Sequence, residues 1–124
     1  MKKLLFIFVL STSIASAQWV QKTSCNKNAA KISNEAIESM VNLEYLTARG
    51  MAMAALLIDS DCGCAQLTLA AISSSNKNWG SQKEKLKGID YLNLSAEEKT
   101  WHGFLMSSSE DRPAAIKLGL TKHP

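Results

Sequence analysis

Apolar residues recur every three or four positions along most of the chain after residue 33, with polar residues between them. This spacing is typical of amphipathic α-helices, because it places one apolar stripe along each helix. Alternating strand patterns and the dipeptides typical of β-hairpins are missing from the sequence. The pattern therefore predicts an all-α fold, a short stack of antiparallel helical hairpins over 33–124.

The first predicted helix begins near Ser33, and either Ser33 or Asn34 can cap it. Gly50 either ends this helix after Arg49 or lies within a longer helix that continues to Ile58. A glycine costs about 1 kcal/mol inside a helix relative to alanine, so both alternatives stay open. A clear break follows over 59–63, where capping residues end in a glycine.

Four further helices follow the break. An alanine-rich helix closes in the polar run 73–78, and the next is predicted over 81–91. In this 81–91 helix Leu86 and Ile89 are expected to face inward, together with Leu92 just after it. The third begins at Ser95, where Ser95-Ala96-Glu97-Glu98 is a capping box, and stops in the serine run 107–109.

The last predicted helix follows Asp111, runs through 114–121 and ends in the basic residues and proline of 122–124. Asp111 is expected to cap it, and Pro113 lies in its first turn, where the missing N–H does no harm.

The first residues have the layout of a secretory signal peptide. Lys2 and Lys3 precede an apolar run over 4–10 and a small-residue stretch that ends at Ala17, which predicts a signal peptide over 1–17 and cleavage before residue 18. The apolar run is far shorter than the roughly 20 residues that cross a bilayer, so no stable membrane insertion is expected after cleavage. The predicted location is periplasmic or extracellular. The polar, aperiodic stretch 18–32 is predicted to be poorly ordered.

The charge balance changes once the signal peptide is removed. The chain has 14 basic and 11 acidic residues and a net charge of +3. Cleavage removes two lysines, which lowers the net charge to +1 and leaves no basic cluster larger than 83–87. Since nucleic-acid binding needs clustered cations, the sequence excludes a nucleic-acid partner.

Three cysteines lie in the exported part of the chain, where oxidising conditions favour disulfides. Cys25 can pair with either Cys62 or Cys64, and closing such a loop would stabilise the fold by about 3 to 4 kcal/mol. Alternatively, Cys62 and Cys64 form a soft-metal or redox pair with Met51 and Met53, a ligand set that suits Cu(I). The methionines lie in a run that predicts a buried helix, which favours structural cysteines with neither a bound metal nor a cofactor.

The stretch 54–70 resembles the junction between two tetratricopeptide repeats. In that family a helix with small residues ends at Asp-Pro, and the next repeat opens with a Leu-Gly pair. Ser60 stands where the family prefers proline, and the C-terminal half, 92–124, is similar to the degenerate repeats of exported bacterial members. The matching positions are Ala48, Ala52 and Ala55 in the first of these helices and Leu69 and Ala70 in the second.

The resemblance implies a stack of helical hairpins that presents a groove to a protein or peptide partner, without chemistry of its own. Signatures of enzymes are missing: no phosphate-binding glycine loop, no His-Glu-x-x-His pair and no Gly-x-Ser-x-Gly elbow. His102 is the candidate general base, but it is better explained as an ordinary helix residue. Glu97 and Glu98 point about 100° apart on a helix, which does not suit a catalytic pair.

We therefore expect an exported, non-enzymatic helical-repeat module that binds an unidentified protein or peptide. Two alternatives remain at this stage, a small periplasmic metal or redox carrier that uses Cys62 and Cys64, and a truncated fragment of a longer repeat protein. The three tryptophans are the first candidates for contacts with a partner, although each also suits a packing role: Trp19, Trp79 and Trp101.

Overall fold

The computed structural model describes residues 19–73, 79–108 and 110–122. The predicted signal peptide lies outside the described residues. Every regular element within them is helical, which confirms the predicted all-α fold. The elements are α1 (Lys27–Val41), α2 (Tyr45–Ile58), α3 (Gly63–Ile72), α4 (Trp79–Lys87), a 3-10 turn η1 (Tyr91–Asn93), α5 (Ala96–Met106) and α6 (Arg112–Lys122).

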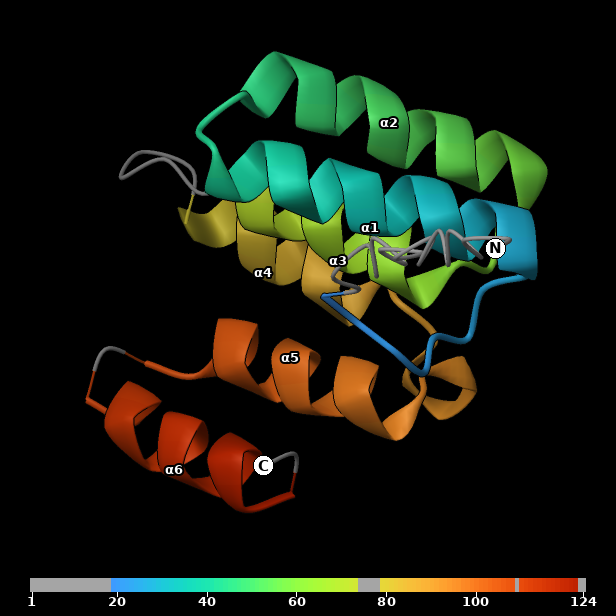
Figure 1. The fold of residues 1–124 in the computed structure, drawn as a ribbon. Coiled ribbons are helices and arrows are strands. Elements are labelled where there is room, and N and C mark those ends of the chain that lie inside the picture. The colour runs from blue at the N-terminus through green and yellow to red at the C-terminus, as the bar shows by residue number, and fades with distance from the viewer. Residues whose placement is uncertain (1–18, 74–78, 109, 123–124) are drawn as a thin grey trace, which may run out of the picture.

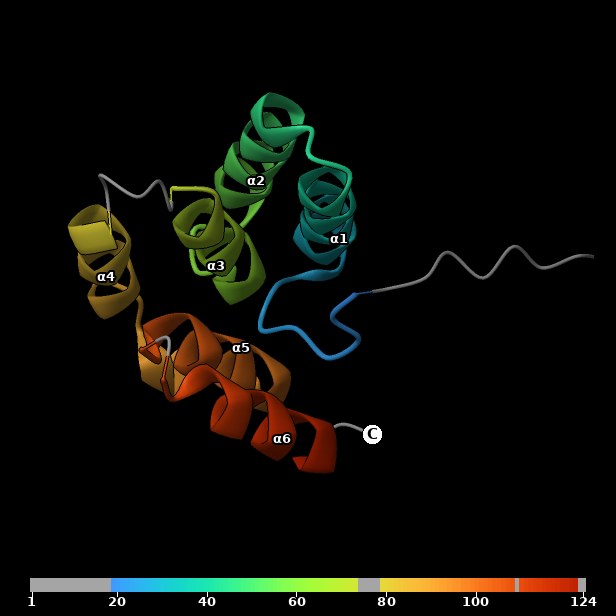
Figure 2. The same cartoon turned by 90° about the vertical axis from the view of Figure 1, so that its left-hand side faces the viewer.

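Successive helices run in alternating directions across the molecule (Figure 1). Seen nearly end-on, α1 to α4 form a curved layer, and α5 and α6 lie together below it (Figure 2). Helix α1 packs against α2 and α3, whereas α5 contacts α3, α4 and α6. The chain is thus a stack of antiparallel helices with a second layer made by its C-terminal pair.

Helix α1 begins at Lys27, six residues before the predicted start at Ser33. Asn26 is the true cap, because its Oδ1 accepts a hydrogen bond from the Ala29 N–H at 2.9 Å. Ser33 and Asn34 instead lie buried in the middle of the helix. Part of the stretch 18–32, predicted to be poorly ordered, thus forms the start of α1, and several described residues before it bond remote parts of the chain.

The break between α1 and α2 falls at 42–44, and neither sequence alternative placed it there. The Asn42 N–H closes α1 by donating to the carbonyls of Glu38 and Met40, and Leu43 adopts a left-handed conformation with φ of 65°. A leucine is uncommon in this region of backbone space, and neither glycine nor proline marks the turn in the sequence. Helix α2 then passes through Gly50 without interruption and ends at Ile58.

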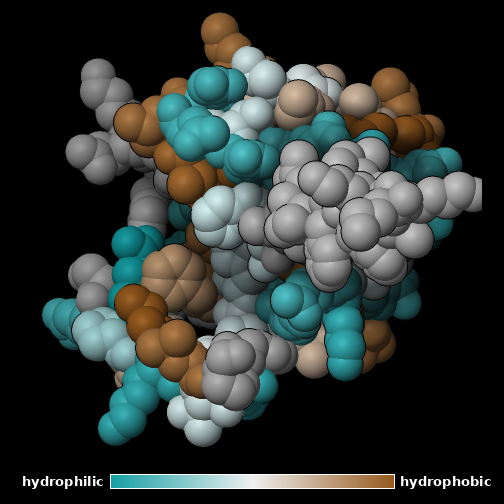
Figure 3. Space-filling model, viewed as in Figure 1, coloured by the Kyte–Doolittle hydropathy of each residue, from teal (hydrophilic) through white to brown (hydrophobic). Residues whose placement is uncertain are grey.

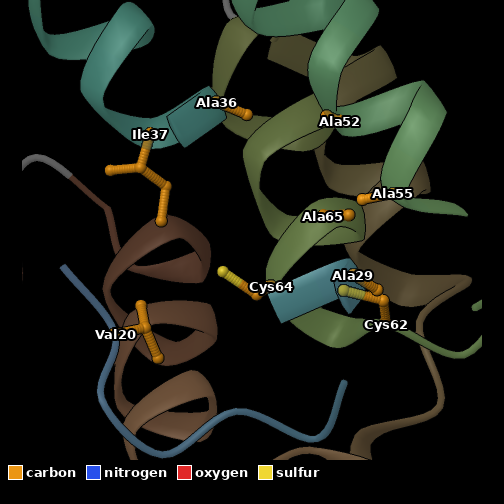
Figure 4. Packing of buried hydrophobic residues seen from close by; sticks show 9 residues of the cluster. All are labelled: Val20, Ala29, Ala36, Ile37, Ala52, Ala55, Cys62, Cys64 and Ala65. Carbon is orange, nitrogen blue, oxygen red and sulfur yellow. The ribbon is translucent and has the colours of Figure 1, made fainter. Parts of the chain in front are cut away.

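Two clusters of buried side chains form the core. The first joins α1, α2, α3 and Val20, which precedes α1, and is built mostly from small residues that allow close helix packing (Figure 4). The second joins α3, α4 and α5, and Trp101 packs against both clusters. The first consists of Val20, Ala29, Ala36, Ile37, Ala52, Ala55, Cys62, Cys64 and Ala65, and the second of Leu67, Ala70, Leu86, Ile89, Leu94 and Leu105.

The capping box at the start of α5 is confirmed. The Ser95 hydroxyl accepts from the Glu98 N–H, and the Glu98 carboxylate accepts from the Ser95 N–H. Leu86 and Ile89 face inward as predicted, but Leu92 is 84% exposed. Helix α4 ends at Lys87, and the Leu92 N–H instead bonds the Asp90 carboxylate in η1, which turns the leucine toward solvent.

Candidate functional site: an apolar groove closed by the N-terminal segment

Residues 19–26, here called the N-terminal segment, pass between the α1 to α3 layer and α5 (Figure 2). Val20 is buried, and its backbone N–H and carbonyl both bond the Asn34 side chain, at 2.9 and 3.2 Å. The backbone N–H of Gln21 donates to the Glu97 carboxylate at 2.9 Å. Because these partners belong to α1 and α5, the segment connects the two layers of the molecule.

Glu98 is the strongest polar anchor of the N-terminal segment. Its side chain is fully buried, and its two carboxylate oxygens accept from the backbone N–H groups of Ser24 and Ser95, at 3.0 and 2.9 Å. Hydrogen bonds to a charged acceptor are stronger than neutral ones, which offsets part of the cost of burying the carboxylate. The capping box revealed one of these bonds, whereas the contact with Ser24 spans 74 residues and has no local signal.

The cysteines attach the end of the N-terminal segment to α3. Cys25 forms a disulfide with Cys62, and Cys64 is left as a buried thiol. The Ser33 hydroxyl lies 3.2 Å from the Cys62 sulfur. Figure 4 shows the Cys64 sulfur directed toward the side on which Val20 and Ile37 lie. Burial and the nearby Glu98 carboxylate raise the pKa of the Cys64 thiol to about 12, so this sulfur is protonated and unreactive near neutral pH.

Position 63, between the two cysteines, has room only for glycine. Its backbone N–H donates to the Ser24 hydroxyl at 3.1 Å. A Cβ atom at this position would overlap the side chain of Leu94 and would lie 2.8 Å from the Glu98 carboxylate and 2.9 Å from the Ser24 hydroxyl. The Cys62-Gly63-Cys64 sequence therefore forms a crowded joint between α3, the N-terminal segment and the start of α5.

The proposed soft-metal ligands do not form a free thiolate and thioether set. The Cys62 sulfur is bonded to Cys25, Met51 accepts a hydrogen bond from Ser39, and Met53 is mostly exposed on α2. Within 19–73, 79–108 and 110–122, no group of three or more His, Cys, Asp or Glu side chains is placed to hold a metal ion.

His102 has a structural environment on α5. Its Nε2 lies 3.0 Å from the Leu86 carbonyl oxygen, and since a carbonyl only accepts, the ring must donate its Nε2–H there. The ring also packs edge-on against Tyr91, with 5.3 Å between the centroids. These contacts fix the imidazole between α4, η1 and α5.

An apolar groove of about 460 Å³ opens beside the N-terminal segment. We call it the apolar groove, and its walls come from that segment, α1, α5 and α6. Glu97 is the one charged residue among those that line it. The lining residues are Trp19, Val20, Ile37, Met40, Glu97, Thr100, Trp101, Phe104, Ala115, Ile116, Gly119 and Leu120.

Several lining side chains are presented to solvent. Trp19, Ile116 and Leu120 are 51%, 50% and 65% exposed, although each is large and apolar. Hydrophobic surface is visible along α6 in the space-filling view (Figure 3). Trp19 and Trp101 thus lie at one site, while the side chain of Trp79 lies outside the described part of the structure. The groove itself could not be read from the sequence, because its four walls are far apart along the chain.

No family model matches the chain, and no match was found among curated proteins or solved structures. None of the described helices combines the length and the apolar character needed to cross a membrane. The function must therefore be inferred from the groove and its surroundings.

Proposed function

We propose that this chain is an exported, non-enzymatic helical module that binds an apolar segment of a protein or peptide in the apolar groove. The observation that carries the proposal is the exposure of Trp19, Ile116 and Leu120 along one concave surface. Large apolar side chains gathered on an exposed surface typically mark a binding site. Aromatic residues at such a site give a partner much contact area.

The charge of the groove indicates the chemistry of its partner. One oxygen of Glu97 accepts from the Gln21 N–H, and the other carboxylate oxygen can accept from a ligand. An apolar segment that carries one lysine or arginine would bury its side chains against Trp101 and Phe104 and place its cation near Glu97. Such a partner matches both the shape and the single charge of the surface.

Three further observations support the remaining parts of the proposal. The Cys25–Cys62 disulfide suits an oxidising compartment, in agreement with the signal-peptide pattern. The antiparallel packing of α1, α2 and α3 is the arrangement expected of stacked helical hairpins, which supports a tetratricopeptide-like module. His102 and Glu98, the residues most easily taken for catalytic groups, are engaged in structural hydrogen bonds.

A pair of leucine variants on α6 provides the test. Leu120 lines the apolar groove, whereas Leu118 on the same helix is also exposed but faces a different surface. Peptides selected by display against the disulfide-bonded protein would be measured against L120Q and the matched control L118Q by fluorescence anisotropy. We expect L120Q to weaken binding about tenfold, because burying a leucine is worth about 1.5 to 3 kcal/mol, and L118Q to leave it unchanged.

The same experiment can contradict the proposal. If both variants bind a selected peptide as the parent does, the apolar groove is not the binding surface. If no peptide is selected by the folded protein, the chain is not a peptide-binding module of this kind. Replacing the cation of a selected peptide by glutamine should also weaken binding, and an unchanged affinity would remove Glu97 from the site.

A further inference from the structure

A second groove lies between α2 and α4, with α3 as its floor. Its volume is about 600 Å³, and it shares no lining residue with the apolar groove. Figure 2 shows α3 set between α2 and α4, which places the two walls on opposite sides. We call it the cationic groove, lined by Arg49, Met53 and Leu56 from α2, Gln66 and Leu69 from α3, and Lys85, Gly88 and Ile89 near α4.

Every charged residue that lines the cationic groove is positive. Arg49 lies on the α2 wall and Lys85 on the α4 wall, and both are exposed. Within the described part of the chain neither forms a salt bridge, whereas Lys87 on the same helix as Lys85 is paired with Glu84 at 3.1 Å. The groove is thus lined by one cation from each wall, neither of them in a salt bridge among the described residues, and by no carboxylate.

The surface between the two cations is apolar. Leu56 and Leu69 are partly buried and belong to the packing of the first core cluster, while Met53 is 55% exposed on the wall. Methionine adapts readily to the shape of a bound side chain. A ligand would therefore meet an apolar floor in the middle of the groove and a positive charge on each side of it.

From this arrangement we propose that the cationic groove binds an acidic amphipathic peptide. An apolar stripe of the peptide contacts Leu56 and Leu69, and carboxylates on the two sides of that stripe pair with Arg49 and Lys85. A guanidinium can bind a carboxylate through two parallel hydrogen bonds, which fixes the orientation of the peptide on the α2 side. The site does not depend on the apolar groove, so the two can be tested separately.

The probe is a synthetic helical peptide with a leucine stripe flanked on both sides by glutamates. Its counterpart carries glutamine in place of each glutamate. The full disulfide-bonded chain is compared with the R49Q/K85Q variant and with K31Q/K117Q, a control that removes the same charge from exposed positions on α1 and α6. Unfolding curves verify that all three proteins have the same stability.

We expect the glutamate peptide to bind the parent protein about tenfold more tightly than it binds R49Q/K85Q, a difference of about 1.4 kcal/mol. The glutamine peptide should bind the parent protein about tenfold more weakly than the glutamate peptide does. K31Q/K117Q should bind the glutamate peptide with an affinity within about twofold of the parent. The difference in affinity between the two peptides should shrink as salt is added, because dissolved ions screen exposed charges, with a Debye length of about 8 Å at 0.15 M.

Four results would overturn the proposal. Equal affinities of the two peptides would leave no role for carboxylates, and an equal loss in K31Q/K117Q would reduce the effect to net charge. Failure of the parent to bind the glutamate peptide would remove the peptide site. The parent could also bind phosphatidylserine vesicles and not the peptide. If R49Q/K85Q lost that vesicle binding, the two cations would belong to a membrane-binding surface.

Discussion

The disulfide between Cys25 and Cys62 should supply a large share of the stability of this chain. The two residues are 37 positions apart, and the chain-entropy relation for a closed loop of that length gives about 4 kcal/mol. The total unfolding free energy of a small domain is typically about 5 to 15 kcal/mol. The double variant C25A/C62A, which removes the bridge and prevents a new one with Cys64, should therefore be close to the limit of stability.

The measurement is urea unfolding followed by circular dichroism and tryptophan fluorescence. The control is C64A, which removes a buried sulfur without opening a loop and should cost only about 1 kcal/mol. We expect the double variant to lose about 4 kcal/mol beyond the cost of its missing sulfurs. Its urea dependence should also steepen, because the unfolded chain is no longer held compact.

Hydrogen exchange shows which part of the structure loses stability in C25A/C62A. The amides of Val20 and Ser24 are bonded to Asn34 and Glu98, and they should lose protection in the double variant more than the amides inside α3. If the free energy falls by less than about 1 kcal/mol and both amides stay protected, the hydrogen bonds alone hold the N-terminal segment. The entropic reasoning would then be refuted for this loop.

Four further outcomes are expected. Gly63→Ala should lower the free energy of unfolding by about 1 to 3 kcal/mol, because its Cβ has no room, whereas Gly50→Ala should raise it by about 0.5 to 1 kcal/mol. Equal effects of the two substitutions would contradict the crowding at Gly63. Glu98→Gln should lower the free energy of unfolding by about 1 to 3 kcal/mol, since the NH2 group of the glutamine would face a backbone N–H. An unchanged urea midpoint would show that the carboxylate does not stabilise the fold. Cys64, with a pKa of about 12, should resist iodoacetamide at pH 8 in the native state and react in urea, and alkylation of the native protein at pH 8 would contradict its burial. Because the pKa is raised in the folded state, the free energy of unfolding should fall as pH rises from about 9 toward 12. Mass spectrometry of the exported protein should find an N-terminus at Gln18, and a retained 1–17 segment would contradict the signal-peptide prediction.

Local signals predicted those parts of the fold whose causes are local. The capping box at Ser95 involves residues three positions apart, and the break over 59–63 is marked by capping side chains and a glycine. The turn at Leu43 could not be predicted, because a leucine with positive φ is held by the helices on either side of it. The inward position predicted for Leu92 is wrong for a related reason, because α4 ends at Lys87 and Leu92 lies in the 3-10 turn η1.

The candidate site was less accessible to sequence reasoning than the helices. The sequence predicts Trp19 and Trp101 as candidate contact residues, but their common location depends on the path of the N-terminal segment. That path is set by bonds from Val20 to Asn34 and from Ser24 to Glu98, which join residues 14 and 74 positions apart. Polar residues with distant partners have no periodicity, and the segment therefore resembled a disordered lead-in.

The bonds of the N-terminal segment also determine the order in which the chain can finish folding. During synthesis, Ser24 emerges long before Glu98, its partner 74 residues later. Cys25 likewise waits for Cys62, and Cys64 follows almost at once as a competing thiol. In the folded chain, the packing of α1 on α3 accompanies the pairing of Cys25 with Cys62 and leaves Cys64 as a buried thiol. The N-terminal segment can therefore complete its hydrogen bonds only after Glu98 has been synthesised.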